Sequence, residues 1–435
     1  MQLNRRGFIA LSLALAARPA LAADRGQLCC EVLIDWHRLI LELVRHTATY
    51  SPPVASRAFA YLGVAAHEVL ASGDPALVSL AGQLNGLAPL PPRGEGAFDA
   101  AAVMQAALAE AVPALFGNTG PTGQRAMAAM ARKQAAATAT GLPEAVAARS
   151  AAHGAALARH LLAWAAADGG AVVANMGFPQ DYTPGAAPQD WVPTSLVRQQ
   201  QAPLLPDWGK VRPFAMPAGD ACALPPPPPY SEAPDSDFYR AALEVRDAVA
   251  GLTEEQRLIA RFWSDDPMLS PTPPGHWIAI LLEIAARDGL SAERLAGALA
   301  LLGVAVADGF IACWQTKFEI NLLRPVTYIR RVIQPDWEPL LITPPFPEYP
   351  SGHSSQSGAA ATVLTALFGE DFAFVDTTHA DDGLPVRSFP GFWAAAEEAA
   401  ISRLYGGIHY RFAVERGLDQ GRCVGAHALA LRITA

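Results

Sequence analysis

The sequence has little positive charge, few lysines and no long apolar segment after its first residues. The chain has 32 lysine and arginine residues and 41 acidic residues, which gives a net charge of −9. This balance argues against a nucleic-acid partner or a general basic membrane surface. Beyond the N-terminal region no run of about eighteen apolar residues lacks a charge or a histidine, so we expect no stable membrane anchor. The only lysines are Lys133, Lys210 and Lys317.

Strand-type alternation is also almost absent, whereas apolar residues recur at helical spacing, which predicts an all-α fold. We expect a targeting segment at residues 1–23 and an N-terminal helical lobe at residues 24–168. Its helices should be broken at residues 51–53, 117–120 and 141–143. A connection rich in proline and glycine follows at residues 169–235, and a helical core occupies residues 236–435.

The first 22 residues resemble a twin-arginine export signal. Arg5 and Arg6 precede a short apolar run at residues 9–17, and residues 20–22 read Ala-Leu-Ala, a typical cleavage site. The run is too short to span a bilayer permanently. This pattern predicts export of a folded protein to the periplasm or beyond, with an uncleaved N-terminal helix as the alternative.

The five cysteines have no metal-site spacing, and their number is odd. Cys29 and Cys30 are adjacent, so a bridge between them would be strained. A protein that folds before export has no need of disulfides. We therefore expect mostly free thiols.

Four short motifs contain the candidate chemistry. Lys317 is followed after six residues by Arg324-Pro325, and the sequence Pro-Ser-Gly-His ends at His353. Ser402-Arg403 and His409 complete the set. Each motif alone is typical of an ordinary helix face or loop, but all four in this order favour a site for a tetrahedral oxyanion.

The spacing of the motifs supports an anion site. Lys317 and Arg324, seven residues apart, would share one face of a helix that Pro325 ends. A second helix is expected at residues 353–368, so backbone N–H groups near Ser351 and Gly352 would face an anion at its N-terminus.

These motifs resemble those of the type 2 phosphatidic acid phosphatase and vanadium-dependent haloperoxidase superfamily. Three stretches are similar to its bacterial haloperoxidase branch: residues 262–277 (FWSDDPMLSPTPPGHW), 321–329 (NLLRPVTYI) and 344–353 (PPFPEYPSGH). The resemblance covers about residues 230–425. It implies the helical bundle of that superfamily, preceded here by a helical lobe.

The resemblance also implies roles for the motif residues. His409 would bond vanadium, or attack phosphorus in a phosphatase. His353 would be the acid–base residue, and Lys317 would polarise peroxide. The oxygens of the vanadate cofactor, or of phosphate, would be held by Lys317, Arg324, Ser351, Gly352 and Arg403.

Trp314 and Phe346 match positions that line the halide pocket in chloride-oxidising members of the family, although two ordinary core aromatics would look the same. The family pattern has an aspartate four residues after the last histidine, and this chain has Ala413 there. Glu415, Asp419 or a backbone carbonyl would have to replace that carboxylate.

Asp265 and Asp266 form a further acidic pair. Such a pair is able to bind a cation, but one pair without further ligands is weak evidence for a cation site. Pairing with an active-site arginine is the stronger interpretation, and a simple capping turn is as plausible.

The sequence therefore predicts an exported, vanadate-dependent haloperoxidase that uses hydrogen peroxide to oxidise chloride or bromide, giving hypohalous acid or a halogenated small organic acceptor. A phosphomonoesterase with a phosphohistidine at His409 is the first alternative. An oxyanion-binding protein without catalysis is the second. Whether the chain forms a homodimer stays open.

Overall fold

The computed structural model describes residues 5–173, 182–194 and 202–435, and the side chains of its first helix from Arg25 onward. The elements of the first half are α1 (Arg5–Arg45), α2 (Pro52–Ala71), α3 (Ala100–Leu115), α4 (Pro121–Ala139), α5 (Glu144–Ala166), α6 (Gly170–Val173) and the short 3₁₀ helix η1 (Trp208–Lys210). Those of the second half are α7 (Asp237–Ala250), α8 (Glu254–Phe262), α9 (Thr272–Asp288), α10 (Ala292–Ile320), α11 (Pro325–Val332), α12 (Gly352–Phe368), β1 (Phe374–Asp376), β2 (Arg387–Phe389), α13 (Phe392–Tyr405) and α14 (Arg411–Leu429).

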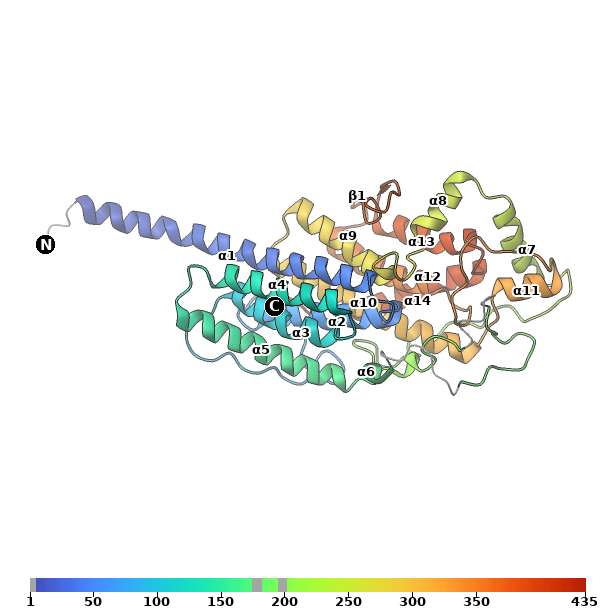
Figure 1. The fold of residues 1–435 in the computed structure, drawn as a ribbon, viewed down its shortest axis with the longest axis horizontal. Coiled ribbons are helices and arrows are strands. Elements are labelled where there is room, and N and C mark those ends of the chain that lie inside the picture. The colour runs from blue at the N-terminus through green and yellow to red at the C-terminus, as the bar shows by residue number, and fades with distance from the viewer. Residues whose placement is uncertain (1–4, 174–181, 195–201) are drawn as a thin grey trace.

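The fold is mainly helical, as the sequence predicts (Figure 1). Within the described ranges the named strands are β1 and β2, which form one short antiparallel pair. Figure 1 shows α1 to α5 towards one end of the molecule and α7, α8 and α11 towards the other. The expected breaks at residues 51–53, 117–120 and 141–143 all separate helices.

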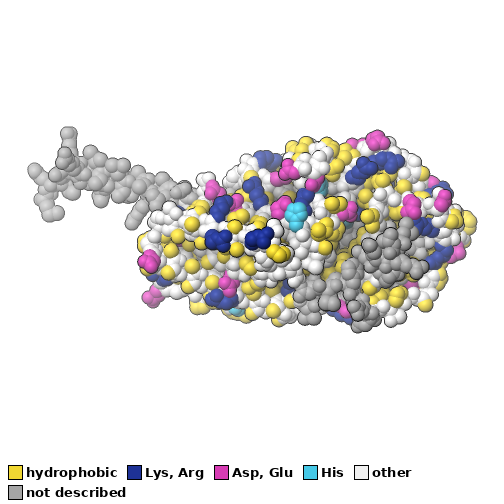
Figure 2. Space-filling model, in the orientation of Figure 1, with side chains coloured by type: hydrophobic (Ala, Val, Ile, Leu, Met, Phe, Trp, Pro, Cys, Tyr) yellow, Lys and Arg dark blue, Asp and Glu magenta, His cyan; other side chains and the backbone are white. Residues whose placement is uncertain are grey.

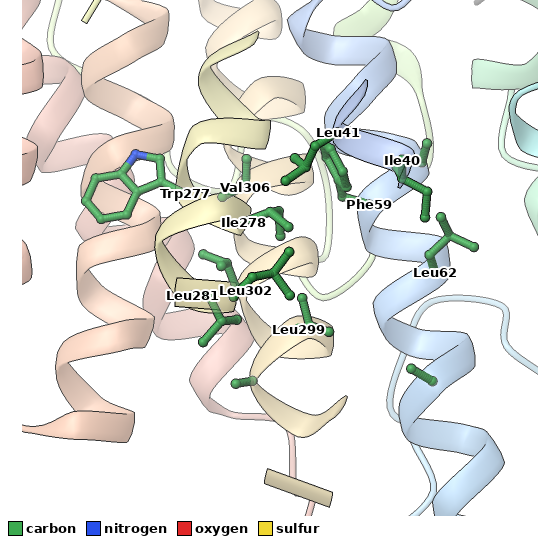
Figure 3. Packing of buried hydrophobic residues seen from close by; sticks show 14 of the residues in the cluster. Ile40, Leu41, Phe59, Leu62, Trp277, Ile278, Leu281, Leu299, Leu302 and Val306 are labelled. Carbon is green, nitrogen blue, oxygen red and sulfur yellow. The ribbon is translucent and has the colours of Figure 1, made fainter. Parts of the chain in front are cut away.

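The hydrophobic core joins the two halves of the chain. Side chains of α9 and α10, such as Ile278 and Leu302, lie beside Leu41 of α1 and Phe59 of α2 (Figure 3). The last residues return to the first half as well, because the amide of Ala435 donates to the carbonyl of Ala76. The proposed boundaries of the lobes remain predictions.

Helix α10 is the central element of this core. It is long and apolar enough to cross a membrane, but the apolar window that meets this test is completely buried inside the protein. Its closest neighbour is α2, and a Cβ atom on Gly303 would lie 2.9 Å from the Cα atom of Ala60. Glycine at this position therefore allows the two backbones to approach. The last turns of α10 carry Trp314 and Lys317.

The prediction that Lys317 and Arg324 share one helix is wrong. Helix α10 ends at Ile320, and Asn321 adopts a left-handed conformation with φ 53° that asparagine tolerates at a helix end. Pro325 does not end a helix but begins α11, with Arg324 as its N-cap. Proline suits this first position because the N–H that it lacks would have no helical partner there. Arg324 therefore lies on an extended segment between two helices.

The starts of α9 and α12 place two histidines in helices. Helix α9 begins at Thr272, so His276 lies in its first turns, and the prolines there fit the start of a helix. The helix expected at residues 353–368 begins one residue earlier, and the Ser351 side chain caps it by accepting from the amide of Ser354. Parts of the expected export signal (residues 1–4) and of the expected connection (residues 174–181 and 195–201) lie outside the described residues.

The expectation of mostly free thiols is wrong for one pair. Cys222 and Cys423 form a disulfide whose Cα atoms are 5.8 Å apart across a sequence separation of 201 residues. Such a separation gives no sequence signal, because only the fold brings the two residues together. Cys29, Cys30 and Cys313 are free and buried.

Acidic and basic side chains are interspersed on the face shown in Figure 2, as a net acidic chain with scattered arginines would predict. The cationic side chains of the four motifs are not on the surface, because Lys317, Arg324 and Arg403 are all buried. The concentrated positive charge is thus an internal feature.

Candidate functional site

The four sequence motifs meet inside the helical bundle. Lys317 comes from the end of α10, Arg324 from the segment before α11, and Ser351 and His353 from the start of α12. Arg403 lies in the last turn of α13, and His409 lies in the short connection to α14. Close packing of α12 on α14 supports this convergence: a Cβ atom on Gly358 would lie 2.9 Å from the carbonyl oxygen of Leu418.

His409 is held between a carboxylate and a guanidinium. Arg324 Nη1 lies 3.1 Å from His409 Nε2, and Glu348 Oε1 lies 2.8 Å from His409 Nδ1. A guanidinium only donates hydrogen bonds, so Nε2 must accept from Arg324. In the neutral imidazole the proton is then on Nδ1, which donates to Glu348. The lone pair of Nε2 therefore points into the cationic cluster, where it accepts from Arg324.

Glu348 is the orienting carboxylate that the sequence analysis missed. Its Oε1 also accepts from the amide of Tyr410, and its side chain is fully buried. Glu415 and Asp419, which we considered as replacements, are exposed on α14, and Ala413 only offers its carbonyl to the amide of Ser351. Glu348 was visible in the sequence as the one carboxylate within PPFPEYPSGH, but only the fold shows that this loop faces His409.

Arg324 is fixed by two carbonyls and still has donor capacity. Its Nε donates to Phe346 and its Nη1 to Ile408, both at 2.9 Å. The buried Nη2 atom has no hydrogen-bond partner among the described residues. A buried cation with unused N–H groups is costly unless an acceptor arrives, so this atom points to an anionic ligand.

Arg403 and His353 show the same pattern. Arg403 Nη1 donates to the carbonyl of Trp263 at 2.8 Å, whereas its Nε is buried and unpaired within the described part of the chain. His353 Nε2 is likewise buried without a partner there. The charges of Asp266 and Asp265 act on Arg403 and favour its charged form. The expected ion pair with an arginine does not form among the described residues, because Asp265 pairs with His276 and His379 instead.

Lys317 has a different environment. Its ammonium group donates to the carbonyls of Pro347 and Glu348 at 2.8 and 2.9 Å, and also to that of Pro350. All three protons of the ammonium are therefore engaged. Lys317 contributes its charge to the site and ties down the loop that carries Glu348, and a direct bond to an oxyanion would require one carbonyl to be released.

Trp314 and Phe346 form an apolar wall beside these cations. Their ring centroids lie 4.8 Å apart, and the Phe346 ring lies 5.2 Å from Lys317 Nζ and 4.9 Å from Arg324 Cζ. The rings shield the charges from water and attract them through their π faces. This position is compatible with the predicted halide pocket.

The pKa values reflect a buried site with more positive than negative charge. Burial lowers the pKa of Lys317 to about 7 and those of Arg324 and Arg403 to about 10. Burial and the neighbouring cations hold the pKa of His409 well below its usual range, so the imidazole is neutral. Burial raises the pKa of Glu348 to about 7. An entering anion would stabilise every cation of the cluster.

The anion site expected at the start of α12 is present in modified form. The amide of Ser351 is already bonded to the carbonyl of Ala413, at 3.0 Å, and is not available to a ligand. The positive end of the helix still faces the cluster, and the hydroxyl of Ser351 keeps its proton free to donate because its oxygen only accepts from Ser354.

Comparison with known proteins agrees with this geometry. Residues 298–433 match the family model described as the second helical-bundle domain of VCPO. A solved bacterial vanadium-dependent iodoperoxidase is 38% identical, with a TM-score of 0.84, over 93% of this chain and 97% of that one. The chain belongs to the vanadium-dependent haloperoxidase family.

More distant members of the family match smaller parts of the chain or the fold alone. Vanadium chloroperoxidase of Curvularia inaequalis is 25% identical over 289 residues, which span 51% of this chain and 47% of that protein. The chain thus covers about half the length of this relative. A bacterial vanadium-dependent chloroperoxidase structure shares the fold with a TM-score of 0.66 at 18% identity, covering 88% of this chain and 92% of that one.

Proposed function

We propose that this family member oxidises halide with hydrogen peroxide at a vanadate group held by the cationic cluster. The observation that supports this best is the set of unpaired buried nitrogens, Arg324 Nη2, Arg403 Nε and His353 Nε2, around a neutral His409. An oxyanion with several acceptor oxygens would satisfy the two arginines. His409 Nε2 would offer its lone pair to the metal once Arg324 Nη1 donates to the oxyanion instead. The residues present therefore fit vanadate.

The bound vanadate would supply Lewis-acid activation of peroxide without a change in its own oxidation state. Arg324 and Arg403 would hold its oxygens through their free N–H groups, with Ser351 adding a hydroxyl. Glu348 would keep the proton of His409 on Nδ1 and so keep Nε2 available. Lys317 would add positive charge, and the preorganised charges would stabilise negative charge that develops on oxygen.

His353 is suited to accept a proton from hydrogen peroxide. Burial and Arg403 lower its pKa well below the ordinary value, so the imidazole is neutral before the reaction. Its Nε2 has no competing partner among the described side chains. After the transfer, the charge of Asp265 would help to stabilise the imidazolium.

We propose iodide as the halide that will be oxidised most readily, followed by bromide. The relative that is 38% identical over nearly its whole length is an iodoperoxidase, and iodide is also the easiest of these ions to oxidise. The wall of Trp314 and Phe346 would remove water from the halide as it approaches the cations. Chloride oxidation remains a prediction from the sequence alone.

The two alternatives from the sequence have less support. A phosphatase would use the same cations, but the extended similarity to an iodoperoxidase favours peroxide chemistry. The case for a binding protein without catalysis depended on the missing carboxylate at Ala413, and Glu348 supplies that carboxylate.

We also propose export to the periplasm or the medium. The arginine pair before a short apolar run supports it. The Cys222–Cys423 disulfide supports it independently, because such bonds persist mainly in oxidising compartments. Cell fractionation tests this proposal. If the signal is of the twin-arginine type, the Arg5→Lys/Arg6→Lys variant should stay in the cytoplasm, whereas the unchanged protein should be exported.

A paired assay tests the proposed activity. Purified protein, stripped of oxyanions, is assayed for peroxide-dependent oxidation of iodide and bromide with and without orthovanadate, and for phosphate release from an aryl phosphate. We expect halide oxidation only with vanadate, and inhibition by excess phosphate. Phosphate release that vanadate inhibits, without any halide oxidation, would replace this proposal with the phosphatase.

A further inference from the structure

A second cluster of ionisable side chains is buried beside the oxyanion site. Apart from the charge of Asp265, which acts on Arg403 and His353, the proposed reaction does not use it. Asp265 lies in the loop after α8, His276 in the first turns of α9, and His379 in the turn after β1. Asp265 Oδ2 is 2.9 Å from His276 Nδ1, and Asp265 Oδ1 is 3.1 Å from His379 Nε2. The three donor atoms all lie within 4.8 Å of one another, and the side chains are 0–4% exposed.

The other ring nitrogen of each histidine faces a second carboxylate. His276 Nε2 is 2.8 Å from Asp376 Oδ2, and His379 Nδ1 is 3.1 Å from Asp382 Oδ2. Histidines that bind metals almost always donate their remaining N–H to such an acceptor, which fixes the tautomer and makes the ligand nitrogen more basic. Both histidines of the cluster have this arrangement, each with its own carboxylate.

The negative charges of the cluster exceed its fixed positive charge. Asp265, Asp376 and Asp382 carry three negative charges, and Arg45, bonded to Asp382 at 2.8 Å, carries one positive charge. Three minus one leaves two uncompensated negative charges if both imidazoles are neutral. Buried charges must be neutralised. Two protons on the imidazoles would do so, and one divalent cation would do so equally.

We propose that Asp265, His276 and His379 bind one divalent cation of the zinc class. Two imidazole nitrogens and a carboxylate oxygen are ligands that zinc prefers, at about 2.0–2.2 Å each. Tetrahedral coordination at that length separates neighbouring ligand atoms by about 3.3 Å. Asp265 Oδ1 lies 3.1 Å from His276 Nδ1 and 3.1 Å from His379 Nε2, which is close to this value, so small shifts of the side chains would admit the ion.

The ion would be structural. The donor atoms are buried, so a substrate has no access to the ion. The three side chains would fill three tetrahedral positions, and the second oxygen of Asp265 or a water molecule would have to fill the fourth. The ion would join the loop after α8, the start of α9 and the turn after β1. It would also support the oxyanion site, because the Trp263 ring stacks on His276 at 4.5 Å while the Trp263 carbonyl holds Arg403.

The other group of potential ligands does not compete with this one. Cys222 and Cys423 lie near His427, but their sulfurs are joined in the disulfide and cannot bind zinc as thiolates.

Metal analysis of the full-length protein, purified without a metal-chelating resin and dialysed against zinc and then against buffer, tests the proposal. We expect about one zinc ion per chain by mass spectrometry. X-ray absorption at the zinc edge should show two imidazole ligands. Removal of the ion with dipicolinate should lower the melting temperature, and zinc but not magnesium should restore it. None of these readouts involves vanadate, so their failure would leave the proposed activity untouched.

Variants assign the ligands. His379→Gln should reduce zinc to below about a tenth of an ion per chain, and Asp382→Asn should weaken zinc binding by about 10–100-fold without abolishing it. His46→Gln is the matched control, since His46 is exposed and lies outside the cluster. If His379→Gln does not fold, the X-ray absorption spectrum of the wild type decides whether two imidazoles bind zinc. A wild-type protein that holds less than about a tenth of a zinc ion, or a His379→Gln variant that binds zinc like His46→Gln, would overturn the proposal in favour of two protonated imidazoles.

Discussion

The Nδ1 atom of His409 lies 2.8 Å from Oε1 of Glu348, across a sequence separation of 61 residues. This contact gives the histidine a defined tautomer even though Ala413 occupies the position where the family pattern has an aspartate. Because Arg324 donates to Nε2 from the other side, the imidazole is fixed at both nitrogens. A metal centre would take the Nε2 lone pair only after Arg324 Nη1 turns from His409 to an oxygen of the incoming oxyanion.

The Glu348→Gln variant tests that relationship. The amide keeps the shape of the side chain but loses its charge, so it holds the Nδ1 proton less firmly and Nε2 becomes a weaker ligand. We expect vanadate affinity, measured by equilibrium dialysis, to fall by about 10–100-fold. Glu415→Gln, which changes an exposed carboxylate on α14, is the control and should bind vanadate like the wild type. Equal affinity in both variants would show that Glu348 is not the orienting group.

Arg324 should be needed for vanadate binding, and His353 for turnover. Arg324→Ala removes a buried donor of charge-assisted hydrogen bonds, so we expect vanadate affinity to fall by at least about tenfold. His353→Ala should keep most of the affinity but lose peroxide-dependent turnover, since it removes only the proton acceptor. Arg331→Ala, an exposed arginine on α11, serves as the control. The division of roles fails if both variants lose affinity equally.

Oxyanion affinity should decrease as the pH rises through neutrality. The pKa of Lys317 is lowered to about 7, so its positive charge is lost above that pH, and the pKa of Glu348, raised to about 7, adds a negative charge over the same interval. Both changes weaken the attraction for an anion. Sulfate, whose own charge is constant across this interval, is a suitable probe in a calorimetric titration.

Two lysine variants assign the pH effect. Lys317→Met should bind sulfate more weakly and with a shallower pH dependence, because only Glu348 would still titrate. Lys210→Met, at an exposed position in η1, should keep the wild-type profile. A profile that stays flat in the wild type would contradict the assignment.

The disulfide should contribute to stability. A bond between Cys222 and Cys423 closes a loop of about 200 residues and so restricts the unfolded chain. We expect the Cys222→Ser/Cys423→Ser variant to lose about 2–5 kcal/mol. A reductant should lower the melting temperature of the wild type but leave that of the double variant unchanged. If the reductant lowers the melting temperatures of both proteins alike, its effect does not come from this disulfide.

The sequence predicted those features that depend on residue type and short spacing. The helices followed from apolar periodicity, and Arg403, His353 and His409 were recognised from motifs a few residues long. The contacts that depend on long-range packing were not predictable. Glu348 and the Cys222–Cys423 bond are determined by which loops and helices meet, and no local pattern records this. The left-handed Asn321, which separates Lys317 from Arg324, was missed because a continued helix was equally compatible with the spacing.

The central claim is that the site works only with vanadate bound at His409. The most direct measurement is a titration of oxyanion-free protein with orthovanadate, followed by iodide oxidation, in the wild type, in His409→Ala and in His427→Ala as the control on α14. We predict a rate that rises to a plateau at about one vanadate per chain in the wild type and the control, and no vanadate-dependent rate in His409→Ala. A rate that does not depend on vanadate, or that persists unchanged in His409→Ala, would contradict the account.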